Sequence, residues 1–220
     1  VDAAMEAALE AMRARGATIF DVELPDVLLN AWPALMGPVV DRELEPQLDA
    51  YLQTLPAGGP RSLVELLAGY RALPSDGPYP PVSAARLDYY AGVVGGPGLA
   101  DVGYLFTVTN RLPDAREDAL VALAEQALDA LVFPTMSCPA SPLFTVEDDA
   151  TYACDAGDPF VPGYVSCVTG FPEITVPAGM TRQGLPVGIS FFGRPYAEPR
   201  LIALAYAFEH ATRARRPPRA

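Results

Sequence analysis

Residues 169–195 read TGFPEITVPAGMTRQGLPVGISFFGRP, and this stretch decides the fold. Its glycines and prolines recur in a dense, ordered series around two short apolar runs, 174–177 and 187–192. Glycine permits tight turns and close backbone approach, and proline can flank a strand end without removing a donor that the ladder needs. The stretch therefore predicts a strand, a turn region at 179–184 and a second strand.

Helical and strand-like patterns continue on both sides of this stretch. The apolar spacing predicts helices at 3–15, 62–72, 114–131 and 199–212, and strands at 18–24 and 131–133. Asp114 is predicted to cap its helix. Between residues 25 and 111 prolines and glycines are frequent, so only short helices separated by turns are expected there. Alternating helices and short apolar strands predict an α/β fold with helices covering a sheet.

Composition excludes several classes of function. The chain has 220 residues, 50% of them hydrophobic, and a formal net charge of -12. This acidity argues against binding to nucleic acids and to anionic membranes. All 15 basic residues are arginine, and the absence of lysine excludes P-loop, Schiff-base and serine-lysine chemistry by this chain alone.

The cysteines and the single histidine offer little chemistry. Cys138, Cys154 and Cys167 are odd in number and form no CxxC pair, which argues against a disulfide framework and a zinc ribbon. We expect all three to be small buried apolar side chains in a protein of the reducing cytoplasm. His210 fits a favourable charge near a helix C-terminus, although a cysteine hydrolase that uses it as base stays an alternative.

Two further patterns are expected to be ordinary loops. The acidic run 147–149 lacks the spacing of a calcium loop, so we predict no metal site there. The glycines of 95–98 lack the lysine of a phosphate-binding loop and are expected to form a turn.

The ordered motifs together resemble the C-terminal half of the amidase signature hydrolases. The resemblance rests on DALVFPT at 129–135, on the motifs at 169–179 and 184–195, and on the final helix. Residues 1–25 are similar to the helix and strand just past the middle of these enzymes, and 62–67 resembles the peptide-amidase-like branch. The resemblance implies that the chain forms part of a mixed-sheet fold. It also implies hydrolysis of a carboxamide to an acid plus ammonia or amine, a reaction that needs no cofactor.

The catalytic groups that the resemblance implies lie outside this chain. The family uses a Lys-Ser-Ser triad, whereas these residues contain no lysine and no adjacent serine pair. We therefore expect 1–220 to be the C-terminal half of an amidase domain, with no catalytic residue of its own and inactive without the N-terminal half. The alternative is a truncated, non-catalytic binding or scaffold module.

Substrate contacts are expected at strand ends, where open α/β sheets bind ligands. The candidates follow the strand at 131–133 and precede the strand at 174–177: Met136, Ser137, Cys138, Ser166, Cys167, Val168 and Thr169. Simple loop packing is the alternative for all of them. Many relatives carry asparagine where Cys167 stands.

The middle of the chain hints at the substrate class. Aromatic residues gather there: Trp32, Tyr70, Tyr79, Tyr89, Tyr90 and Tyr104. They suggest an aromatic or hydrophobic amide as the small-molecule substrate. The sequence predicts only about four strands, which would form a small sheet. An uncovered edge of that sheet would favour association into a homo-oligomer.

Overall fold

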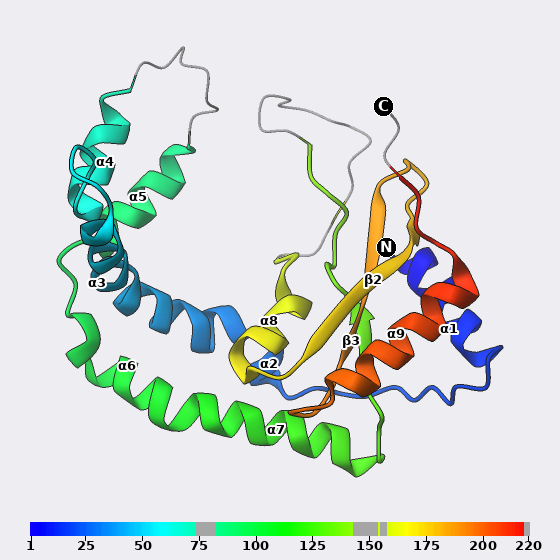
Figure 1. Ribbon diagram of the computed structural model, residues 1–220. Helices are drawn as coiled ribbons and strands as arrows, with labels where there is room; N and C mark the ends of the chain where they lie inside the picture. The colour runs from blue at the N-terminus through cyan, green and yellow to red at the C-terminus, as the bar shows by residue number, and fades with distance from the viewer. Residues whose placement is uncertain (74–81, 143–153, 155–157, 218–220) are drawn as a thin grey trace. The chain divides into compact units, whose positions relative to one another are not determined.

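The computed structural model describes residues 1–73, 82–142, 154 and 158–217 (Figure 1). The chain forms two compact units, one made of Val1–Trp32 with Pro113–Ala220 and a smaller one made of Pro33–Leu112. The larger unit combines helices with a sheet, so the predicted α/β class is confirmed.

The sheet of the larger unit contains β1 (Leu131–Pro134), β2 (Glu173–Met180) and β3 (Pro186–Phe192). Their order is β1-β3-β2 and both pairings are antiparallel, so β3 is the central strand. Ser190 in β3 lies opposite Thr175 on one side and opposite Phe133 on the other. The predicted strands at 131–133, 174–177 and 187–192 are confirmed.

Helices pack on this sheet and build the core. The larger unit has α1 (Asp2–Arg13), α2 (Asp26–Leu29), α8 (Val161–Thr169), α9 (Glu198–Thr212) and all but the first residue of α7 (Leu112–Glu125). The core cluster joins α1 and α9 to β2 and β3: Ala8, Val176, Ile189, Phe191, Leu201, Ala205 and Phe208. The rings of Phe191 and Phe208 lie 5.9 Å apart in an edge-to-face arrangement, a favourable geometry for two aromatic rings.

Two predictions near the ends of these elements are wrong. Residues 18–24 are extended but belong to no strand of the described sheet, and Phe20 is exposed. Alternating polarity sets which face of a segment is apolar, but it cannot supply the neighbouring strand that a ladder needs. Asp114 does not cap α7, because that helix already begins at Leu112 and Asp114 lies in its first turn.

The smaller unit is more helical than its composition predicted. Its elements are α3 (Gly37–Thr54), α4 (Leu63–Arg71), α5 (Ala84–Val93), η2 (Gly98–Ala100), α6 (Val102–Phe106), η3 (Thr107–Arg111) and all but the first residue of η1 (Trp32–Met36). The expectation of only short helices is wrong for α3, which runs for 18 residues with Pro46 inside it. The helix predicted at 62–72 is confirmed as α4, with Ser62 as its N-cap.

Acidic side chains of α3 connect this helix to other segments of the smaller unit. Asp41 accepts a hydrogen bond of 2.8 Å from the Tyr89 hydroxyl, and Glu43 accepts one of 2.7 Å from the Tyr104 hydroxyl. Burial, reinforced by Asp41, raises the pKa of Tyr89 to about 12. Glu45 accepts from the backbone N–H of Gly95, where a turn follows α5. The turn expected at 95–98 is confirmed only at its start, because Gly98 already belongs to η2. Long-range contacts of this kind override local propensity.

Across the described ranges, every helix is too short or too polar to cross a bilayer.

Candidate ligand pocket

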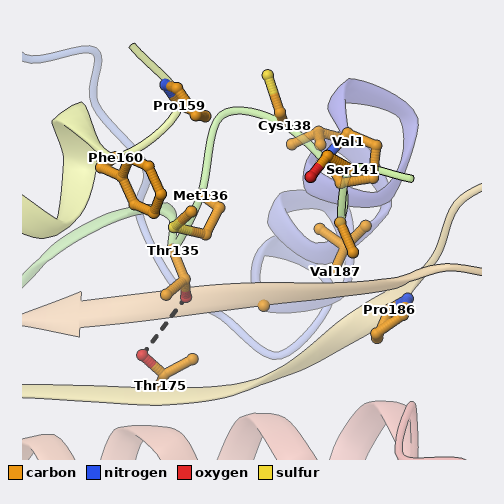
Figure 2. Close-up of a pocket in the computed structure, with 13 residues that line it drawn as sticks. Val1, Thr135, Met136, Cys138, Ser141, Pro159, Phe160, Thr175, Pro186 and Val187 are labelled. Atoms are coloured by element: carbon orange, nitrogen blue, oxygen red, sulfur yellow. Dashed lines mark hydrogen bonds between the residues drawn. The ribbon is translucent and has the colours of Figure 1, made fainter. Parts of the chain in front are cut away.

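A cavity of about 660 Å³ opens in the larger unit beside the start of β3 (Figure 2). Its lining comes from the segment after β1, the segment before α8, and the two strands β2 and β3. The lining residues are Val1, Thr135, Met136, Cys138, Pro139, Ala140, Ser141, Pro159, Phe160, Thr175, Pro186, Val187 and Gly188. The volume lies within the range of pockets that hold small molecules.

Two backbone hydrogen bonds hold the segment after β1 in place. The Thr135 N–H donates to the carbonyl of Gly188 over 3.0 Å and so extends the β1–β3 contact beyond Pro134. The Ser137 N–H donates to the carbonyl of Pro159 over 3.0 Å. The segment is thus tied at two points, and Met136 between them is fixed at the cavity.

Three hydroxyl groups meet at the cavity floor, one from Thr135 directly after β1, one from Thr175 in β2 and one from Ser190 in β3. The oxygens of Thr135 and Ser190 are 2.9 Å apart, and those of Thr175 and Ser190 are 3.1 Å apart. Thr135 and Thr175 are separated by 3.4 Å, the contact drawn as a dashed line in Figure 2. Ser190 is fully buried, whereas Thr135 and Thr175 reach the cavity. We call these three residues the hydroxyl cluster.

Gly188 leaves the space that the hydroxyl cluster occupies. A Cβ atom at this position would lie 2.8 Å from Thr135 Oγ1 and 3.0 Å from Thr175 Cγ2. Side chains do not approach one another that closely, so any larger residue at 188 would displace one of the threonines.

The walls of the cavity are apolar. The apolar side chains in the lining include those of Met136, Pro159, Phe160, Pro186 and Val187. None of the lining side chains, all of them from the described part of the chain, is charged. An apolar cavity with a few converging polar atoms is the usual form of a small-molecule site.

Behind the wall, aromatic rings hold Phe160 and α8 in position. The ring of Tyr164 lies 6.4 Å from that of Phe160 and 5.7 Å from that of Trp32. Burial, assisted by Asp158, raises the pKa of the Tyr164 phenol above its ordinary value. Asp158 also accepts a hydrogen bond of 2.9 Å from the Phe160 N–H. These contacts fix the position of the Phe160 ring at the cavity.

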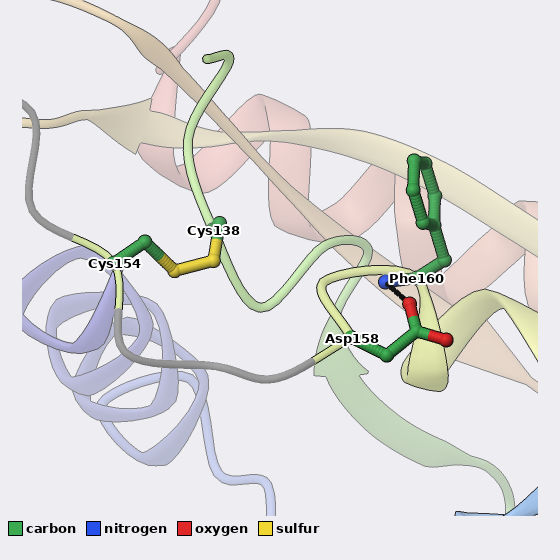
Figure 3. Close-up of a disulfide and its surroundings, with 4 residues drawn as sticks. All are labelled: Cys138, Cys154, Asp158 and Phe160. Carbon is green, nitrogen blue, oxygen red and sulfur yellow. Dashed lines mark hydrogen bonds between the residues drawn. A yellow bond between two sulfur atoms is a disulfide. The ribbon is translucent and has the colours of Figure 1, made fainter. Parts of the chain in front are cut away.

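A disulfide joins Cys138 at the cavity to Cys154, with the two Cα atoms 5.7 Å apart (Figure 3). The expectation that all three cysteines are small apolar core residues is therefore wrong. An odd cysteine count does not prevent one pair from bonding when the fold brings two together. The reducing compartment expected from the sequence stays a prediction.

We expect a thiol titration of the native protein to find one reactive thiol per chain. Cys167 is free and exposed, while Cys138 and Cys154 are bonded to each other. Titration with a chromogenic disulfide reagent before and after reduction in denaturant should give one and then three thiols. Cys167→Ser should abolish the native signal and leave two thiols after reduction. Three thiols in the native protein, isolated under oxidising conditions, would contradict the bridge.

The structure brings together only part of the sequence-predicted site. Met136 and Cys138 line the cavity, and Ser137 between them bonds through its backbone to the segment before α8. The four candidates at 166–169 do not line this cavity.

Residues 166–169 belong to the last turn of α8 instead of to a loop. Val168 and Thr169 are buried, and the Thr169 hydroxyl donates to the Val165 carbonyl over 2.7 Å. Gly170, with a φ of 68°, ends the helix. The loop prediction failed because Pro162 at the helix start and β-branched residues within it obscured the helical pattern.

The other candidates from the sequence stand apart from this cavity. His210 lies in α9, where its ring stacks on that of Tyr206 at 6.0 Å. The acidic run 147–149 falls outside the described residues. The part of the chain that the structure describes contains no cluster of acidic, cysteine and histidine residues able to hold a metal ion.

Sequence reasoning missed the hydroxyl cluster itself. Thr175 and Ser190 stand between apolar residues of their strands, which was a readable signal. Their convergence with Thr135 depends on strand register, which the sequence did not provide.

Comparisons with known proteins match this chain to amidases. A family model described as Amidase matches residues 1–202. A probable amidase of Arabidopsis thaliana is 51% identical over 55 residues, which is 25% of this chain and 11% of that protein. A component of the glutamyl-tRNA(Gln) amidotransferase of Treponema denticola is 40% identical over 86 residues, or 38% of this chain and 17% of that one.

Solved structures match over the whole length of the chain. Native peptide amidase from Stenotrophomonas maltophilia superposes with a TM-score of 0.75 and 32% identity, covering 99% of this chain and 41% of that one. A peptide amidase in complex with the competitive inhibitor chymostatin gives a TM-score of 0.74 with 32% identity, covering 100% of this chain and 42% of that one. The chain thus spans less than half the length of the peptide amidases that it matches.

Proposed function

The chain belongs to the amidase family, and from this premise we propose that it is part of an enzyme that hydrolyses a carboxamide. Water adds to the amide, the C–N bond breaks, and an acid is released together with ammonia or an amine. The observation that carries the proposal is the family match over residues 1–202. The end-to-end superposition on peptide amidase at 32% identity supports it.

We assign the catalytic groups to polypeptide outside residues 1–220. A Lys-Ser-Ser triad requires a lysine and two serines, and this sequence has no lysine. In this proposal the chain supplies a pocket wall and part of the sheet, and the N-terminal half of the amidase is its partner. The acyl-enzyme therefore forms on a serine of that half, and water releases it.

Within this chain the cavity is the proposed substrate contact. Met136 and Cys138 line it, and Ser137 positions the segment that carries them. Ser166, Cys167, Val168 and Thr169 are proposed to act less directly, because α8 supports the segment that carries Phe160. The small-molecule amide would lie against the apolar wall.

A measurement of ammonia release tests the assignment of activity. The 220-residue chain should release no ammonia from a C-terminally amidated dipeptide above the uncatalysed rate. The longer protein, translated with the reading frame upstream of Val1, should do so. Turnover by the 220-residue chain alone would refute the assignment of the triad to the missing half.

The lack of lysine also favours a second function, a non-catalytic binding or scaffold module. The same experiment separates the two. A stop codon directly upstream, or an inactive longer protein, would favour the module. An upstream lysine and serine pair with measurable ammonia release would eliminate it.

A further inference from the structure

We propose that the hydroxyl cluster of Thr135, Thr175 and Ser190 binds a neutral carboxamide whose apolar portion lies against Met136 and Phe160. This inference deepens the proposed function and rests on it for the link to hydrolysis. The binding itself is argued from the cavity alone.

The hydrogen-bond inventory of the cluster leaves capacity for a ligand. Each hydroxyl has one hydrogen to donate and can accept. Ser190 is buried and lies within hydrogen-bond distance of both threonine oxygens. It can donate to one threonine while accepting from the other. The third hydrogen bond, which Thr135 donates to Thr175, is long at 3.4 Å and therefore weak. A ligand can take the Thr135 hydrogen at little cost when Thr135 accepts from Ser190.

The cavity floor therefore offers one donor hydrogen and free lone pairs side by side. Thr135 and Thr175 are the members that line the cavity. Figure 2 shows their two hydroxyl oxygens directed toward each other. A carboxamide carries a carbonyl acceptor and N–H donors side by side, which complement the donor hydrogen and the lone pairs of the threonines. It can satisfy both kinds of group at once, whereas a simple alkyl group would leave them unpaired at the floor of an apolar cavity.

The absence of charged side chains from the lining selects against the hydrolysis product. No described side chain around the cavity is charged, and a single hydroxyl donor is poor compensation for a buried carboxylate. The amide should bind and the corresponding acid should not. If the amide is hydrolysed, this difference favours release of the acid.

The walls define the rest of the ligand. Met136, Phe160 and Val187 present apolar surface above the floor. Methionine and aromatic side chains adapt well to a flat apolar group. Phenylacetamide, with a phenyl ring one methylene away from its carboxamide, is the appropriate small probe.

Equilibrium binding of phenylacetamide to the 220-residue chain tests the proposal, with toluene as the apolar probe and phenylacetate as the acid. The chain is made with a short extension before Val1, because Val1 lines the cavity and a free α-amino group there would be charged. In the extended chain the Val1 nitrogen is part of an uncharged peptide bond. We expect the chain to bind phenylacetamide at least ~10-fold more tightly than phenylacetate at neutral pH, a difference of about 1.4 kcal/mol.

Thr175→Val removes one hydroxyl while keeping the shape of the side chain. It should weaken phenylacetamide binding by about 3- to 10-fold, the loss of one neutral hydrogen bond. Toluene binding should stay within about 2-fold of the original, because toluene uses only the walls. Thr175→Ser retains the hydroxyl and should bind phenylacetamide as the parent does. Thr212→Val is the matched control, because that hydroxyl donates to the Phe208 carbonyl in α9, away from the cavity.

Unchanged phenylacetamide binding by Thr175→Val would overturn the proposal. So would equal weakening of toluene and phenylacetamide, which would show that the cavity had collapsed. If Thr175→Val does not fold, two other measurements still test the proposal. Equal binding of phenylacetamide and phenylacetate, or loss of phenylacetamide binding in Thr175→Ser, would contradict it. The binding measurements test the hydroxyl cluster, whereas ammonia release tests the proposed hydrolysis. The two proposals can therefore fail independently of each other.

Discussion

Phe192→Ala should lower the free energy of unfolding of the larger unit by about 3–5 kcal/mol, the usual cost of truncating a buried phenylalanine. Phe192 is fully buried at the end of the central strand β3. Its ring lies 5.9 Å from that of Phe171 and 6.4 Å from that of Phe133. The substitution removes apolar contacts on both sides and leaves a cavity that strands cannot readily close.

Urea denaturation followed by far-UV circular dichroism measures this loss. Tyr206→Ala is the matched control, because Tyr206 is 68% exposed on α9 and its truncation should change stability by only about 0.5 kcal/mol. Similar losses for the two variants would mean that Phe192 is not part of a packed core.

Gly188→Ala should lower the free energy of unfolding by about 1–3 kcal/mol, the typical penalty for adding a side chain where there is no space. It should also impair ligand binding in the cavity. The new Cβ would lie 2.8 Å from Thr135 Oγ1 and 3.2 Å from Thr135 Cβ. Thr135 would have to rotate or move, and its contact with Ser190 would be lost. We therefore expect phenylacetamide binding to weaken together with stability.

Gly69→Ala is the control for this prediction, since it makes the same chemical change in a different place. Gly69 lies within α4, and nothing lies within 4 Å of the Cβ position. Alanine is the better helix former by up to about 1 kcal/mol, so this variant should be stabilised. The two glycine substitutions should thus have opposite signs, and a loss of stability at both positions would contradict the structural reason given for Gly188.

Local pattern was sufficient where one element carried its own signal. The helix at 199–212 and the strand at 187–192 were predicted closely, because their apolar residues recur at helical or alternating spacing. The segment 18–24 has the same alternation, yet it forms no strand in the described sheet. Periodicity identifies the apolar side of a segment, whereas pairing depends on a second segment elsewhere in the chain.

The candidate site was predictable only in part for the same reason. Met136 and Cys138 follow the end of a strand directly, so their position at a cavity could be inferred from sequence. Thr135, Thr175 and Ser190 are up to 55 residues apart and meet only through the register of three strands. The bond between Cys138 and Cys154 likewise depends on tertiary placement, which cysteine spacing does not reveal.

The cavity is built from two kinds of structure, and this limits how its selectivity could diverge. The floor lies on neighbouring strands, so a change at Ser190 or Gly188 would also disturb the packing of the sheet. Met136 and Phe160 lie in segments between elements, where substitution disturbs less of the core. Selection or engineering could therefore alter the size and shape of the group that is accepted while retaining recognition of the amide. Libraries directed at the wall residues should yield folded variants more often than libraries directed at the floor.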